Sequence, residues 1–258
     1  MSVACSRFGF AERGGQTALV ASHAELPLLV QRPLRGPAGQ AVLVLLTPAG
    51  ALFDGDALRL EITCGQETDV TLATAAATKL NRCERSLISV EVEVHVAPGA
   101  TFRYLPHELI PFQDTRYRQR IKVDLEGEAR AWLLEVISPG ASHARFTYAR
   151  LEFETEVRGD GVRLARERFS LTPTSAEQLR GHTHYGSLLL FDSELDRGTA
   201  AAINERLACV PAREVAGAST LPTTGVVVKV LGGDAESVRD TLLTCVGCPT
   251  WLSSALPP

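Results

Sequence analysis

Hydrophobic and polar residues alternate along much of the chain. The clearest example is residues 90–96 (VEVEVHV), where four valines would share one face of an extended strand and two glutamates and a histidine the other. This period of two is typical of strands with one buried and one solvated face. The same alternation recurs at residues 58–62, 121–125 and 151–157. Turn sequences such as Pro98-Gly99 separate the segments, so the pattern predicts a mainly β fold of sandwich, barrel or solenoid type.

Helical periodicity is confined to the C-terminal part of the chain. Residues 200–207 predict a short helix, and residues 234–246 predict a better one, which an aspartate can cap. Residues 225–231 (GVVVKVL) predict a buried strand before that helix, and residues 171–179 predict a loop. No segment has the composition of a linker, so we expect residues 1–258 to form a single domain with one or two short helices near the C-terminus.

Composition narrows the function classes. The 258 residues include 26 Lys+Arg and 30 Asp+Glu, and the resulting net charge of −4 argues against a general nucleic-acid-binding or membrane-surface protein. No apolar run approaches the roughly 18 residues that would span a bilayer, and the N-terminus lacks the order of a secretory signal. Six cysteines are too few for a disulfide scaffold, which predicts a cytoplasmic protein with reduced thiols. Residues 208–258 carry few charges and are expected to be either core or a docking surface.

The common motifs of catalysis are missing from the sequence. It has no G-x-x-x-x-G-K-[ST] phosphate loop, no G-x-G-x-x-G, no G-x-S-x-G elbow and no H-E-x-x-H. We therefore expect no nucleotide-driven chemistry in this chain.

A few residues have the spacing of metal ligands. His182 and His184 would lie on the same face of a strand and could share a divalent ion with a third ligand, or they could be two surface histidines. Cys245 and Cys248 have zinc-ligand or redox spacing, but a second pair is missing, so incidental thiols are the favoured interpretation.

Three charged features have a plain interpretation beside a functional one. Asp54-Gly-Asp56 offers two carboxylates for a cation, or a tight turn before a strand. Glu167 lies between two arginines and, taken alone, is a surface charge. Arginines at 116, 118 and 120 would form a basic stripe, which in an acidic chain predicts a solvated face or a protein-docking edge.

Several longer strings occur in an informative order. They are residues 42–60 (VLVLLTPAGALFDGDALRL), 74–82 (TAAATKLNR), 104–112 (YLPHELIPF), 132–136 (WLLEV) and 165–171 (ARERFSL). Together they resemble the urease accessory protein family UreD, called UreH in some organisms. The resemblance covers about residues 15–172 well and 225–245 loosely.

The resemblance implies a metallochaperone scaffold rather than an enzyme, with a fold described as a helical stack of β-sheets. Its expected partners are urease apoprotein, an F-type accessory protein and, indirectly, a G-type GTPase, so GTP would bind only to that partner. No cofactor would be tightly bound, and Ni²⁺ would pass as transient cargo on the way to the urease active site. By motif position Asp56 and Glu167 are candidates for the nickel path, to which His182 and His184 are added.

The sequence departs from the family pattern in two places. Ala49, Ala51 and Asp54 replace glycines of the turn before residues 57–60, and residues 245–258 do not follow the usual C-terminal ending. Two other hypotheses remain open at this stage. One is a β-fold metal-dependent enzyme that uses His182 and His184, and the other is an interaction module with no role in metal handling.

Overall fold

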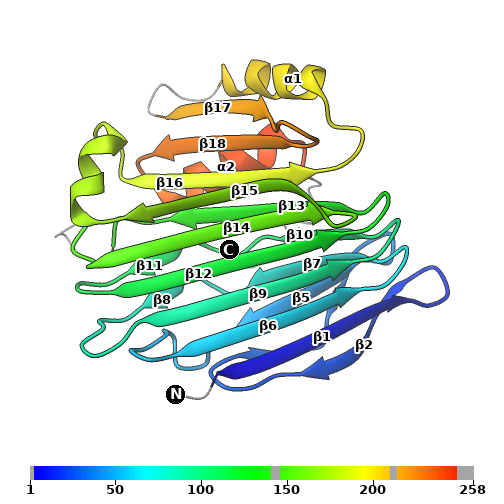
Figure 1. Ribbon diagram of the computed structural model, residues 1–258, viewed down its shortest axis with the longest axis horizontal. Helices are drawn as coiled ribbons and strands as arrows, with labels where there is room; N and C mark the ends of the chain where they lie inside the picture. The colour runs from blue at the N-terminus through cyan, green and yellow to red at the C-terminus, as the bar shows by residue number, and fades with distance from the viewer. Residues whose placement is uncertain (1–2, 141–145, 210–213, 249–258) are drawn as a thin grey trace.

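The computed structural model describes residues 3–140, 146–209 and 214–248, which form two large β-sheets and two helices (Figure 1). The front sheet in this view has seven strands, in the order β15 (Val162–Leu171), β14 (Arg150–Gly159), β12 (Arg116–Leu125), β9 (Ile88–Val96), β6 (Ala57–Cys64), β1 (Ala4–Glu12) and β2 (Thr17–His23). The second sheet has eleven, of which the main path is β17 (Val215–Thr220), β18 (Val226–Gly232), β16 (His184–Phe191), β13 (Arg130–Ile137), β10 (Thr101–Tyr104), β7 (Asp69–Thr74), β5 (Ala41–Leu46) and β3 (Leu29–Val30). The short strands β4 (Leu34–Arg35), β8 (Thr78–Leu80) and β11 (Leu109–Pro111) lie beside this path.

From β5 to β14 the chain coils, passing repeatedly from one sheet to the other. Successive strands within each sheet are therefore parallel, as in β6, β9, β12 and β14 of the front sheet. The register stacks Leu58, Val90, Gln119 and Phe153 in one row across these four strands. The stacked, helical β arrangement expected from the resemblance is confirmed.

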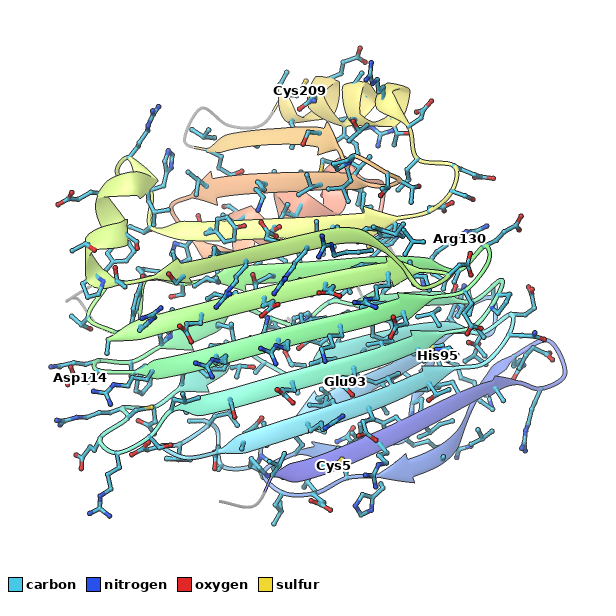
Figure 2. All side chains as sticks on the ribbon, viewed as in Figure 1. Cys5, Glu93, His95, Asp114, Arg130 and Cys209 are labelled. Carbon is cyan, nitrogen blue, oxygen red and sulfur yellow. The ribbon has the colours of Figure 1, made fainter. Side chains whose placement is uncertain are left out.

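The core lies between the two sheets, where the alternating pattern placed it. Val90, Val92, Val94 and Val96 of β9 are all buried, as are the matching positions of β6 and β12. The polar members of the pattern lie on the outer face, where Figure 2 shows Glu93 and His95. The arginine stripe of β12 also lies on this face: Arg118 pairs with Glu152 at 2.9 Å and Arg120 with Glu154 at 3.5 Å. The stripe therefore lies on a solvated face of the described structure.

The two helices cover the far side of the second sheet. Helix α1 (Arg197–Leu207) packs on β17, and α2 (Ala235–Cys245) packs on β16 and β18. Both helices were predicted, and the backbone N–H of Ser237 donates to the Asp234 side chain at the start of α2 over 2.8 Å. The expected loop after β15 is instead a 3₁₀ helix, Pro173–Leu179. Within the described part of the chain, neither helix is long and apolar enough to cross a membrane.

Part of the low-charge region after residue 208 is core where the structure describes it. Val226, Val228 and Val230 of β18 and Val238 and Leu242 of α2 are fully buried in a second apolar cluster between the sheet and the helices. Burial of these residues explains why they are apolar. Residues 249–258, which include the divergent ending, lie outside the described residues.

Close packing of α2 depends on a glycine in β16. A Cβ added at Gly186 would lie 2.4 Å from Cγ1 of Val238 and 2.7 Å from Cδ1 of Leu242, so α2 could not keep its distance from the sheet. By contrast, a Cβ added at Gly217 of β17 would meet no atom within 4 Å. We expect Gly186→Val to lower the free energy of unfolding by about 1–3 kcal/mol, the usual cost of overpacking a core.

Chemical denaturation of Gly186→Val and of the matched variant Gly217→Val measures this contribution. Gly217→Val should unfold at a denaturant concentration close to that of the unaltered chain. Equal stability of all three proteins would contradict the described helix packing.

Candidate functional site: a chamber between the sheets

A small chamber lies inside the sandwich, between the two sheets. It has a volume of about 50 Å³ and a mostly apolar wall that includes Leu58, Leu60 and Val90 of the front sheet. Because a cavity needs roughly 10–15 Å³ to hold one water molecule, the chamber has room for a few waters or a partly hydrated ion. The chamber shares Leu45 and Thr74 with the wall of a larger cleft of about 520 Å³.

Glu135 of β13 is the acidic group of the chamber. It interrupts the interior row Ala131, Leu133 and Ile137, all of which are buried among apolar residues. Of the described residues that line the chamber, Glu135 carries the one carboxylate. The neighbouring Leu134 lies with the second apolar cluster towards the helices, so the strand presents Glu135 to the space between the sheets.

A hydrogen-bond chain from β12 holds this carboxylate. The Gln119 side-chain amide donates to Oε1 of Glu135 at 2.6 Å, and the hydroxyl of Tyr117 donates to Oε1 of Gln119 at 2.9 Å. Burial, reinforced by the charge of Glu167, raises the pKa of Glu135 to about 8, although Lys229 and Gln119 act in the opposite direction. Glu135 therefore exchanges protons near neutral pH, unlike an exposed glutamate.

Glu135, Ser187 and Lys229 form a row of aligned side chains across the second sheet. Glu135 of β13 is the register partner of Ser187 of β16, and Ser187 is the register partner of Lys229 of β18. The row ends near β15, the edge strand of the front sheet. At about 4.8 Å per strand the row spans roughly 10 Å. Ser187 is 3% exposed, and its Oγ has no hydrogen-bond partner among the described residues. The row is thus polar inside an otherwise apolar interior.

Lys229 and Glu167 form an ion pair at the outer end of this row. Nζ of Lys229 donates to Oε1 of Glu167 on β15 and, at 2.6 Å, to the hydroxyl of Tyr185 on β16. The Lys229 side chain is 43% exposed and that of Glu167 26%, so the pair borders solvent. Figure 1 shows why: β15 is the last strand of the front sheet, and β18 and β17 extend beyond it.

His107 lies at the other side of the chamber. Its Nδ1 is 3.0 Å from the carbonyl oxygen of Thr74, and its backbone N–H donates to the Thr74 hydroxyl over 2.9 Å. A carbonyl oxygen can only accept a hydrogen bond, so Nδ1 of His107 donates to it, and this bond fixes the orientation of the imidazole ring. His107 and Thr74 both belong to the wall of the chamber.

Asp54 and Asp56, which the sequence offered as carboxylates for a cation, lie in the turn before β6. The Asp56 carboxylate accepts the backbone N–H of Phe53 at 2.8 Å, in the turn two residues before Leu58 of the chamber wall. Asp54 accepts backbone N–H groups of residues 84–86, and these bonds, chiefly the one from Arg85, lower its pKa. The two aspartates therefore stabilise the turn before β6, which is the tight turn that the sequence predicted as the alternative to a cation site.

His182 and His184 do not share the strand that was expected to align them. Strand β16 begins at His184, whereas His182 lies in the preceding turn, where its N–H donates to the carbonyl of Leu179. Nδ1 of His184 lies 2.9 Å from the hydroxyl of Thr183. Among the described residues, no three His, Cys, Asp or Glu side chains form a group that could hold a metal ion.

The cysteine pair at the end of α2 also lacks the properties of a metal or redox site. Burial raises the pKa of Cys245 to about 11 and also raises that of Cys248, which disfavours the thiolate that binds metals or exchanges disulfides. Both thiols are free in the described structure. The interpretation of these residues as incidental thiols is the one that fits.

Sequence reasoning did not single out Glu135, Ser187 or Lys229. A signal was present in two of the three cases: Glu135 is a lone carboxylate within the apolar string AWLLEVI, and Lys229 is a lone ammonium within GVVVKVL. A single charge inside an otherwise apolar strand is costly unless it has a partner or a function.

Comparisons with known proteins identify the family to which the chain belongs. The model of the family "UreD urease accessory protein" matches residues 2–256. The chain belongs to the UreD family. It is 32% identical to a urease accessory protein UreD of Cupriavidus necator, over 92% of this chain and 85% of that protein. It is 28% identical to one of Actinomyces naeslundii, over 90% of this chain and 88% of that protein.

Four of the five strings that resembled the UreD family contribute residues to the wall of the chamber, and the string 165–171 does not. Thr74 and Thr78 come from the string 74–82, Tyr104 and His107 from 104–112, and Glu135 from 132–136, and all five side chains line the wall. These segments are separated in sequence but are brought together because the chain coils between the two sheets.

Proposed function

We propose that this UreD family member is a non-catalytic scaffold in urease maturation and that nickel passes through its interior. The observation that carries the proposal is the convergence of four of the five family strings on one chamber, in which Glu135 supplies a carboxylate and His107 an imidazole. Nickel is bound in proteins by nitrogen and oxygen ligands of these kinds. Two such ligands with room for water bind an ion weakly, as a transit path requires.

The proposed path has three parts. The cleft beside Thr74 and Thr78 leads into the chamber, the chamber leads to Glu135, and the row Glu135–Ser187–Lys229 leads to the edge of β15. Glu167, a candidate from motif position, lies at that edge. Asp56 lies two residues before the wall residue Leu58, and we keep it as a candidate outside the chamber.

The proposed partners are those of the family: urease apoprotein, an F-type accessory protein and, through the latter, a G-type GTPase. The sequence carries no phosphate loop, which supports placing GTP hydrolysis on the partner. We expect the chain to act where urease is assembled, in the cytoplasm.

Deletion of the gene with co-purification tests this role. Urease from the deletion strain should be assembled but poor in nickel, and the tagged chain should recover urease apoprotein and the F-type protein from cell extract. Urease with full nickel content in the deletion strain would refute the proposal.

The alternative, a metal-dependent enzyme built on His182 and His184, receives no support from the geometry of the described residues, since the two histidines do not share a strand. A stoichiometric metal ion that remains on the purified chain after desalting would restore it.

A further inference from the structure

Lys229 holds the position that a cation in the proposed path would need to occupy. Its Nζ is bonded to Glu167 and to the Tyr185 hydroxyl, and it lies 5.2 Å from the centre of the Tyr185 ring. A carboxylate, a phenol oxygen and an aromatic face together form a cation site. The site is occupied by the chain's own ammonium group.

The strand register places Lys229 at the solvent-bordering end of the interior row. Lys229 follows Glu135 and Ser187 in register on the same face of the second sheet. Ser187 Oγ is buried between them and has no hydrogen-bond partner in the described structure, although a buried hydroxyl normally has one. An ion or water that moved along the row would supply that missing partner.

There is also room for the lysine to leave. Gly217 of β17 is paired directly with Lys229, and a Cβ added there would meet nothing within 4 Å. Directly paired residues of antiparallel strands share a face, so the space over Gly217 lies beside the Lys229 side chain. Four rotatable bonds allow the ammonium to move from Glu167 into this open, solvated position.

We propose that Lys229 is a resident counter-cation of the path: it pairs with Glu167 while no metal is present, and a divalent ion displaces it towards Gly217. The inference rests on the proposed nickel path and deepens it, because it explains how the outer carboxylate stays neutralised between ions. Displacement of a bound ammonium weakens net metal binding at Glu167. The path therefore releases its cargo instead of trapping it.

Nickel titration of the purified full-length chain tests the displacement. The chain is carried as a fusion to a soluble protein without a histidine tag, and Ni²⁺ affinity is measured by competition with a chelating dye. Lys229→Met should bind Ni²⁺ at least tenfold more tightly than the unaltered chain. Lys229→Arg, which keeps the charge, should stay within about threefold of it, and Lys229→Met combined with Glu167→Gln should lose the gain.

An affinity of Lys229→Met equal to or weaker than that of the unaltered chain overturns the inference, provided its thermal unfolding shows a folded protein. Gly217→Val, which fills the open position, should weaken Ni²⁺ binding, and tighter binding by this variant would also count against displacement. The proposed function fails separately, if urease in cells receives nickel normally when both Glu135 and Glu167 are replaced.

Discussion

Replacing Glu135 with glutamine should lower the activation of urease at least tenfold in cells grown with limiting nickel. Glutamine keeps the size of the side chain and can still accept the hydrogen bond that Gln119 donates to Oε1. The substitution removes the one carboxylate among the described residues of the chamber wall. Loss of supporting groups around a metal commonly costs 10–100-fold in affinity or activity, and loss of a ligand should cost no less.

The matched control is Glu93→Gln on the outer face of β9. Glu93 is paired with Arg59 at 2.6 Å and lies on the solvated side of the same sheet sandwich (Figure 2). This variant should activate urease normally. Urease specific activity in cell extract measures both, and full activity with Glu135→Gln would remove Glu135 from the path.

The same substitution should stabilise the folded chain at alkaline pH. The pKa of Glu135 is about 8 in the folded protein and about 4.5 when unfolded. The folded state therefore holds an extra proton between these values, and stability falls as the pH rises through this window. Glutamine has no proton to lose, so Glu135→Gln should be the more stable protein above about pH 8.

The expected difference is on the order of 2–4 kcal/mol, somewhat below the full value implied by the shift, because Glu135 keeps some surface open to the chamber. For a chain of this length that corresponds to a melting temperature about 5 °C or more higher. Thermal unfolding at pH 5 and pH 8.5 measures it. The two proteins should have similar melting temperatures at pH 5, and an equal difference at both pH values would contradict the buried, uncharged carboxyl.

Much of the fold could be predicted from the pattern of apolar residues. Alternation placed residues 90–96 correctly as a half-buried strand, and the apolar stripe of residues 234–246 located α2. Both patterns are local, because each depends on which face of one element is buried. The stacking of the strands into coils is not local: the pattern left sandwich, barrel and solenoid open, and the family resemblance favoured the stacked arrangement.

The site was predicted less well, for a physical reason. Gln119 bonds to Glu135, and Lys229 lies two strands further along the same row, because of the coiling of the chain and the strand register, and neither is visible in a single segment. For His182 and His184 the local pattern itself was misleading. Their spacing predicted a shared face of one strand, but the strand begins only at His184, so His182 lies outside it.

We propose that nickel reaches urease through the interior of this chain. The most direct test is the nickel content of urease, measured by elemental mass spectrometry after purification from cells whose chain carries both Glu135→Gln and Glu167→Gln. The control carries Glu93→Gln and Glu156→Gln on the outer face, and recovery of the partner proteins is checked in both strains. We expect the interior double variant to leave urease almost as poor in nickel as deletion does, with the complex intact, while the outer variant gives full loading. Full nickel loading with both interior carboxylates replaced would contradict the account.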